Sequence, residues 1–237
     1  MLFSQNLSTL VNITSLNLFY VALPHHVQFS QLTNLTSLCL DQKCGIKPKA
    51  LDNMTKLFEL KLINNDEIEG STLRTLTSLR TLYVCGNTTI TDSDIESLPI
   101  RSLSIGYNTR ITSDVLPKLN LTSLDVRGNG RLTSDIIVQC TTLIDLQLHM
   151  IQLSALGLET MSKMTNLRKL TIDWGWERVR LSEDCVKHLT NITHLGLINL
   201  KENIKIPPLA LQSLFVRGTY LIRLDLPIHS IIYSICQ

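Results

Sequence analysis

A leucine-bearing phrase recurs along this chain at a nearly constant interval. Its copies include LTNLTSLCL at 32–40, LTSLRTLYV at 76–84, LNLTSLDVRGN at 119–129 and LTNITHLGL at 189–197. Aligned on one leucine of the phrase, the anchors are Leu16, Leu38, Leu60, Leu82, Leu103, Leu124, Leu146, Leu170, Leu195 and Leu214. A period in the low twenties with the pattern L-x-x-L-x-L predicts a solenoid with one strand per turn. Because a solenoid grows by stacking units, residues 1–237 are predicted to form a single domain.

Residues 79–98, LRTLYVCGNTTITDSDIESL, illustrate one unit. Leu82 and Val84 alternate with outward residues, and this period of two predicts a strand with its leucines facing inward. Four consecutive repeats carry an asparagine three residues beyond the last apolar strand position, namely Asn65, Asn87, Asn108 and Asn129. A buried amide there can satisfy main-chain groups at the bend, so we expect a structural asparagine ladder. A local role of asparagine in a left-handed turn is the alternative.

Short helices are predicted after the bend. Thr or Ser followed by Asp recurs in TDSD at 91–94 and in TSD at 112–114 and 133–135, which is typical of a helix N-cap. The spacing of one helical face follows in the pairs Ile95 and Leu98, Val115 and Leu119, and Ile136 and Cys140. The predicted fold is an α/β, right-handed, curved solenoid of about ten repeats of 21–25 residues. Its parallel strands are expected on the concave face and its short helices on the convex face.

The repeat resembles the leucine-rich repeat family from about Leu10 to about Val216, and its N-x-x-[IL]-T-x-D continuation is similar to the cysteine-containing class of these repeats. That class has Cys or Asn at the ladder position. The resemblance implies a non-catalytic scaffold that binds a partner protein on its concave face. The alternative is a substrate-recognition subunit of a ubiquitin ligase, which usually follows an F-box. No F-box-sized segment precedes Leu10, so this alternative requires a missing or separate F-box.

The two ends depart from the repeat. Residues 1–9 form an N-terminal edge, 10–216 hold the repeats, and 217–237 form an atypical C-terminal strand and cap, with LIRLDLP at 221–227 as the last strand. An uncapped end exposes an apolar layer and an unpaired strand, which favours end-to-end self-association.

Composition bounds the function. A formal net charge of +2 gives no basic footprint for nucleic-acid binding. The sequence shows no activated nucleophile, phosphate loop or metal-ligand cluster, so we expect no enzyme activity, cofactor or metal. No secretory leader or membrane-spanning stretch is evident, and the six cysteines are scattered, which favours a cytoplasmic protein with reduced thiols and no membrane partner. Seven N-x-[ST] sequons are interpreted as by-products of the repeat.

The residues between the strand leucines form the candidate partner-binding surface. Neighbours in an outward column lie about 5 Å apart, so Asp125, Arg127, Gln147, His149, Thr171, Asp173 and Trp174 are expected to form one polar patch with an aromatic edge. Arginine and aromatic residues ringed by polar groups are typical of an interface hot spot, and a solvated face with paired charges is the alternative. The predicted binding residues are Tyr83, Asp125, Arg127, Gln147, His149, Asp173, Trp174 and Arg217. His149 between two aspartates suggests acid–base chemistry but lacks a nucleophile.

The pattern weakens after Asn129. Ile151, Gly175 and Leu200 replace the ladder asparagine, and the insert DWGWERVRLSED at 173–184 holds both tryptophans. We interpret this part as a change of pitch with a bulge near the concave edge, and simple repeat decay is the alternative.

Overall fold

A computed structural model of the chain describes residues 10–23, 29, 31–129, 132, 134–149, 163–173, 189–200, 204–206, 209–218, 222–224 and 232–233. The chain forms two compact units, residues 1–120 and 121–237. All ten anchor leucines lie on β-strands, which confirms the predicted solenoid. The solenoid has about seven regular turns, slightly fewer than the ten repeats that the leucine spacing predicts. Trp174, Ile151 and Gly175 lie outside the described residues.

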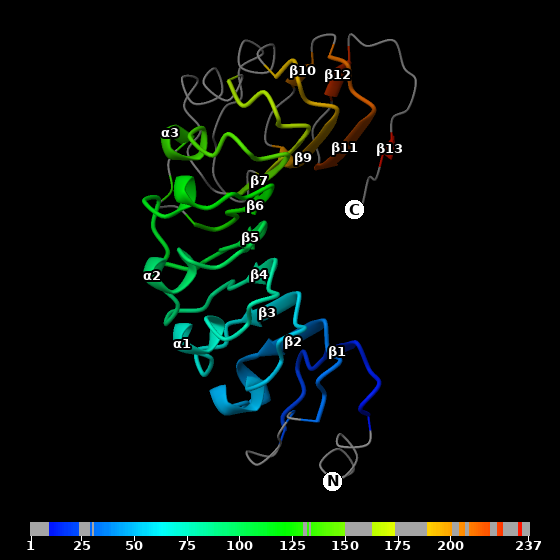
Figure 1. The fold of residues 1–237 in the computed structure, drawn as a ribbon. Helices are drawn as coiled ribbons and strands as arrows, with labels where there is room; N and C mark the ends of the chain where they lie inside the picture. The colour runs from blue at the N-terminus through cyan, green and yellow to red at the C-terminus, as the bar shows by residue number, and fades with distance from the viewer. Residues whose placement is uncertain are drawn as a thin grey trace. The chain divides into compact units, whose positions relative to one another are not determined.

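The first unit contains five parallel strands that pair in chain order. They are β1 (Ser15–Asn17), β2 (Ser37–Asp41), β3 (Glu59–Ile63), β4 (Thr81–Tyr83) and β5 (Ser102–Ser104). Leu38, Leu60 and Leu82 stand opposite one another and are completely buried. In Figure 1 the helices α1 (Gly70–Leu73) and α2 (Asp92–Ile95) lie on the side of this unit away from the strands. The leucine rows therefore fill the space between a strand face and a helix side.

The described residues of the second unit form six parallel strands of the same kind. They are β6 (Ser123–Asp125), β7 (Asp145–His149), β8 (Lys169–Asp173), β9 (His194–Leu200), β11 (Ser213–Gly218) and β13 (Ile232–Tyr233). The expected last strand at 221–227 takes a different place. Only β12 (Ile222–Leu224) is described there, and it pairs with β10 (Ile204–Ile206) in a separate two-stranded sheet, whereas β13 pairs with β11. The ten-residue step after Leu214 is too short for a full turn of the solenoid, which explains the change of sheet.

A repeated hydrogen-bond pattern sets the register at the start of eight strands. The main-chain N–H groups of Phe58 and Glu59 both donate to the oxygen of Thr36, each at 2.8 Å. The same pairing of two donors with one oxygen recurs at β2, β4, β5, β7, β8, β9 and β11. The asparagine of the LTNLT phrase adds a side-chain bond, because Nδ2 of Asn34 donates to the oxygen of Val11 at 3.1 Å. The sequon asparagine Asn34 thus has a structural contact with the preceding repeat.

The bends at the ends of β1, β3, β4, β5, β6 and β9 each place one residue in the left-handed region. Positive φ angles occur two residues beyond the last inward strand position at Tyr20, Asn64, Gly86, Tyr107, Gly128 and Asn199. Gly86 shows why the position is restricted, because an added Cβ would lie 1.8 Å from Oδ1 of Asn64 in the preceding repeat. The position is not tied to asparagine or glycine, however, since two tyrosines occupy it.

The ladder asparagines follow directly after this bend. Asn65 is fully buried, its Nδ2 donates to the oxygen of Asp41 at 2.9 Å, and its Oδ1 accepts from the N–H groups of Glu67 and Ile68. Asn87 and Asn108 make the equivalent contacts one and two repeats later, and Asn129 is also buried. These amides satisfy the main-chain groups that the bend leaves without strand partners.

The helix side is less helical than the sequence predicts. The Thr91 capping box at α2 is present, with Asp94 bonded to the N–H of Thr91 at 3.0 Å. The helix expected after 112–114 is only a 3₁₀ turn, η4 (Leu116–Lys118), because Pro117 cannot donate a main-chain hydrogen bond inside a helix. In α3 (Ser134–Ile137) the buried residue is Ile137 rather than Ile136. Further 3₁₀ turns are η2 (Gln42–Cys44) and η3 (Pro48–Leu51).

Candidate functional site

The strand face of the first unit carries a chain of polar contacts across β2, β3 and β4. The hydroxyl of Ser37 donates to Oε2 of Glu59 at 2.8 Å, and Nζ of Lys61 lies 3.1 Å from Oε1 of the same carboxylate. Nζ of Lys61 also lies 4.7 Å from the centre of the Tyr83 ring, a cation–π distance. Tyr83, a predicted binding residue, is therefore held by a neighbour on the adjacent strand.

The pKa values of this ion pair move apart. Burial raises the pKa of Glu59, but the bonds from Ser37 and Lys61 outweigh burial and bring the pKa below its usual value. Burial lowers the pKa of Lys61, and the contacts with Glu59, Tyr83 and Cys39 outweigh it, so this pKa is raised. Both groups stay charged at neutral pH, and their charges cancel within the face.

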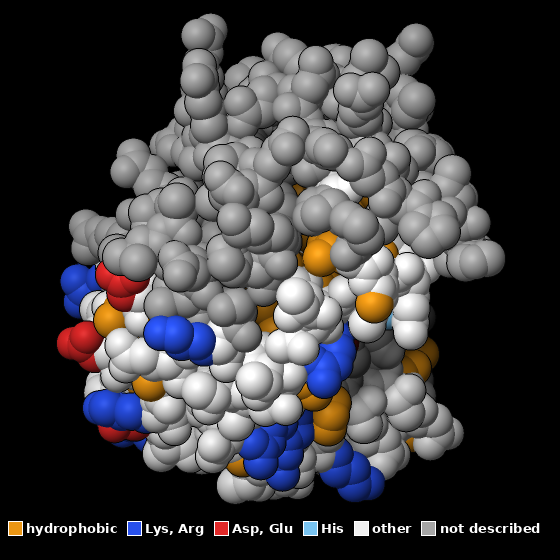
Figure 2. Space-filling view, turned by 90° about the horizontal axis from the view of Figure 1, so that it is seen from above, with side chains coloured by type: hydrophobic (Ala, Val, Ile, Leu, Met, Phe, Trp, Pro, Cys, Tyr) orange, Lys and Arg blue, Asp and Glu red, His pale blue; other side chains and the backbone are white. Residues whose placement is uncertain are grey.

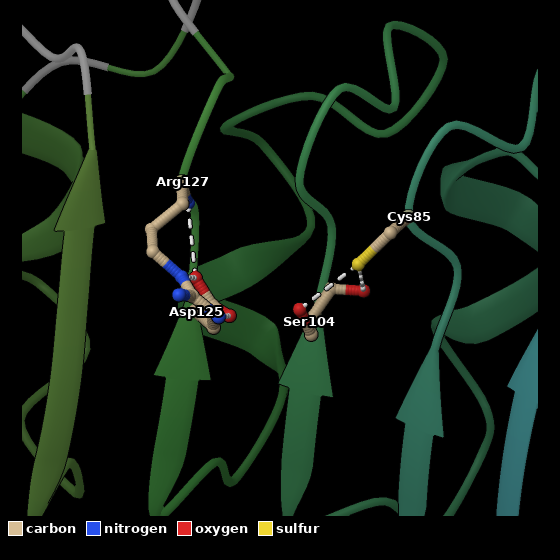
Figure 3. Close-up of polar contacts among 4 residues, drawn as sticks. All are labelled: Cys85, Ser104, Asp125 and Arg127. Atoms are coloured by element: carbon tan, nitrogen blue, oxygen red, sulfur yellow. Dashed lines mark hydrogen bonds and ion pairs between the residues drawn. The ribbon is translucent and has the colours of Figure 1, made fainter. Parts of the chain in front are cut away.

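Two residues of this unit that alternate with the inward apolar residues, and so belong to the outward face, are nevertheless buried. Asp41 is 4% exposed, and its Oδ2 accepts the N–H of Tyr20 at 2.7 Å. Ser104 is 3% exposed, and its hydroxyl lies 3.2 Å from the sulfur of Cys85 (Figure 3). These short side chains fold down onto the sheet and bond to neighbouring strands, so they offer little surface to a partner.

The second unit holds a bidentate ion pair at the end of β6. Nε of Arg127 donates to Oδ1 of Asp125 at 2.8 Å and Nη2 donates to Oδ2 at 2.7 Å (Figure 3). The carboxylate is 12% exposed and the arginine side chain 45% exposed. The planar fork fits the carboxylate and fixes the arginine, so a partly exposed guanidinium lies on the strand face in one orientation.

The register brings the other predicted residues of this unit into two rows. Gln147 stands opposite Asp125, whereas His149, Asp173 and Arg217 share a row that also contains Ile198. Oδ1 of Asp173 accepts from Nδ2 of Asn199 at 2.8 Å. The side chain of His149, like Trp174, lies outside what the structure describes.

A further charged row, absent from the predicted set, runs beside these two. Asp145, Lys169 and His194 stand opposite one another on β7, β8 and β9. Burial raises the pKa of Asp145, the positive charges of Lys169 and His194 oppose the shift, and the negative charge of Asp125 adds to it. The same alternation that identified the two rows places these residues on the outward face as well, because Asp145 lies two residues before Gln147. The sequence pattern therefore could have identified this row.

Cys44 is a second residue whose role the sequence reasoning missed. It is fully buried, and its thiol donates to the main-chain oxygen of Leu18 at 3.0 Å, which is the kind of contact that Asn108 makes with Val84. Cys44 therefore serves as the ladder residue of its repeat, one position later than the asparagines. Burial raises its pKa to about 11.

Two features are absent from the described ranges, a cluster of metal-binding side chains and a helix able to span a membrane. No group of three or more His, Cys, Asp or Glu side chains there could hold a metal ion. Among the same residues, no helix has the length and apolar character needed to cross a membrane. Figure 2 shows Lys and Arg side chains in several separate groups, with Asp and Glu beside some of them, rather than one continuous basic surface.

Comparison with known proteins places the fold. No protein-family model matches the chain. A search of curated proteins also finds no match. Among solved structures, the chain is similar to an internalin, InlF, from Listeria monocytogenes, with a TM-score of 0.55 and 24% identity over 81% of this chain. It is also similar to internalin C2 from the same organism, with a TM-score of 0.55 and 22% identity over 81% of this chain.

The matched region spans 57% of the length of the InlF chain and 83% of the length of the internalin C2 chain. At these identities the likeness concerns the fold alone. The strand register, the buried leucine rows and these neighbours together show that the chain has a leucine-rich repeat solenoid fold.

Proposed function

We propose that the chain is a non-catalytic scaffold that recognises a partner protein through the strand face of its solenoid. The observation that carries the proposal is the Arg127 fork on Asp125, beside the registered row of His149, Asp173 and Arg217. Tyr83 offers a similarly fixed aromatic ring in the first unit. Arginine and tyrosine held in place before binding lose little side-chain entropy on association, which is the property of an interface hot spot.

The experiment compares affinity capture by the intact chain and by two matched variants. The test variant replaces Arg127, Asp173 and Trp174 with alanine, and the control replaces Arg74 and Lys118, which form exposed ion pairs on the helix side. Proteins captured by the intact chain and the control but lost with the test variant support the proposal. Circular dichroism must show that both variants fold. Gln147→Ala provides a milder binding test, because it leaves the ion pair of Asp125 with Arg127 intact. Equal capture by all the chains would contradict the proposal.

Three narrower features belong to the same proposal. Cys44 at a ladder position supports membership of the cysteine-containing class. Cys39, Cys44, Cys85 and Cys140 carry no disulfide, which supports a reducing, cytoplasmic location. Leu10 and Val11 beside β1 are 41% and 40% exposed, which supports end-to-end self-association, and sedimentation at increasing concentration tests it. The comparisons give no support to the ubiquitin-ligase alternative.

A further inference from the structure

Two tyrosines of the first unit occupy a backbone position that disfavours them. Tyr20 has a φ angle of 62° and Tyr107 a φ angle of 56°. The equivalent residues Asn64 and Gly86 are of the types that adopt this conformation at least cost. A bulky residue in the left-handed region is uncommon, and such strain is typical of sites where a side chain has a function.

Both tyrosines also point into solvent. Tyr20 is 68% and Tyr107 61% exposed, more than the other large apolar side chains of the described residues. Phe19 enlarges the aromatic surface at Tyr20, because the centres of the two rings lie 4.2 Å apart. Exposed aromatic side chains contribute nothing to the core, so the strain at these positions is not offset by burial within the unit.

The two tyrosines lie on one edge of the sheet, which we call the strand-end edge. Each follows the matching strand position by three residues, Asn17 on β1 and Ser104 on β5, and the register of the intervening strands is constant. Four strand spacings separate them, a distance of about 19 Å that an extended peptide of roughly six residues spans. Between them lie Gln42, Asn64 and Gly86, which carry no charge.

Apart from one ion pair, the strand face next to this edge exposes no charged side chain. Glu59 and Lys61 form an ion pair, and Asp41 is buried against the N–H of Tyr20. The remaining outward residues of β1 to β5 are neutral, and they are Ser15, Asn17, Ser37, Cys39, Ile63, Thr81, Tyr83, Ser102 and Ser104. A charged partner segment would lose hydration here without gaining an opposite charge, so the surface is complementary to an uncharged one.

We propose that the strand-end edge of the first unit binds an uncharged segment of a partner protein, with Tyr20 and Tyr107 as its two end contacts. The proposal rests on the proposed function and adds where the partner docks and what its chemistry is. Apolar or aromatic side chains of the segment pack on the two rings, and its main chain lies over Gln42, Asn64 and Gly86 between them.

The test uses a random library of displayed peptides longer than the span between the tyrosines, selected on the full chain. Selected peptides are synthesised with a fluorescent label, and their affinities for the chain are measured by anisotropy at low and high salt. We expect peptides rich in uncharged aromatic and aliphatic residues, whose affinities change less than about twofold with salt because no ion pair forms. The double variant Tyr20→Asn with Tyr107→Asn should bind them at least about tenfold more weakly.

Phe58→Asn is the matched control, because Phe58 is 53% exposed but precedes β3 at the opposite end of the strands. It should leave the affinity unchanged. Binding by the double variant within about twofold of the intact chain would overturn the inference, as would charged peptides with strong salt dependence, or a library without binders. Peptides that ignore the tyrosines but need Arg127 and Asp173 would overturn this inference and leave the proposed function standing. Peptides insensitive to both sets of substitutions would contradict both.

Discussion

The side-chain amide of Asn87 donates a hydrogen bond to the main-chain oxygen of Asn65 in the preceding repeat. Its Oδ1 accepts from the N–H groups of Thr89 and Ile90, at 3.0 and 2.8 Å. Asn87→Ala leaves these buried groups without partners, and each unsatisfied group costs about 1–3 kcal/mol. We therefore expect the free energy of unfolding, measured with urea, to fall by about 3 kcal/mol. Asn120→Ala is the control because Asn120 is exposed, and it should change stability by less than about 0.5 kcal/mol. An equal effect of the two substitutions would contradict the ladder.

Tyr107→Asn should stabilise the chain, although it removes an aromatic ring. The position has a φ angle of 56°, and asparagine tolerates the left-handed region better than tyrosine, so we expect a gain of about 1 kcal/mol in the free energy of unfolding. Tyr83→Asn is the contrasting variant, because Tyr83 lies on an extended strand under Lys61 and its loss should be destabilising. A loss of stability in Tyr107→Asn would show that the ring makes contacts worth more than the strain.

Buried thiols should resist modification in the folded chain. Burial raises the pKa of both Cys44 and Cys140 to about 11, so at pH 8 almost none of either is thiolate. Among the four cysteines that the structure describes, Cys85 is partly exposed and should react with iodoacetamide before Cys44 and Cys140. Mass spectrometry of the labelled peptides over time measures the order, and denaturant should make Cys44 and Cys140 react as fast as Cys85. Rapid labelling of Cys44 without denaturant would be incompatible with its ladder contact.

Asp145→Asn should alter the pH dependence of stability. Because burial raises the pKa of Asp145, the folded chain holds this proton more tightly than the unfolded chain does. Stability from this group is present below its ordinary pKa of about 4 and is lost as the pH rises through the raised folded value. Asparagine cannot ionise, so Asp145→Asn does not lose stability as the pH rises. The variant should be more stable than the unsubstituted chain at pH 7 and equally or less stable at pH 3. Solvent screening keeps the gain below about 1 kcal/mol. Thermal melts across this range measure it, with Asp173→Asn as a control.

The fold was largely predictable because its strand pattern is local. Each leucine pair recurs with a period of two, and stacking such units fixes the sheet without any long-range information. The helix side was less predictable. A 3₁₀ turn containing Pro117 replaces an expected helix, and the choice between Ile136 and Ile137 depends on where α3 begins.

The candidate site was predictable as rows but not as contacts. Alternation placed Gln147 beside Asp125 and Asp173 beside His149, whereas side-chain rotamers decide that Arg127 bonds to Asp125 and that Asp41 folds down onto the sheet. The left-handed bends could have been found, since a residue of fixed backbone conformation precedes each ladder asparagine. Asn64 and Gly86 carried that signal, and Tyr107 concealed it.

The paired donors at the start of β8, β9 and β11 keep the spacing of the strand face independent of the length of each repeat. The steps to Leu170 and Leu195 are 24 and 25 residues and the step to Leu214 is 19, yet these leucines stand directly opposite their neighbours. A connection that is longer or shorter than usual therefore does not shift the register of the strands that it joins. Such a scaffold can vary its connecting segments in evolution, or accept inserted sequences in the laboratory, while every outward side chain keeps its position on the strand face.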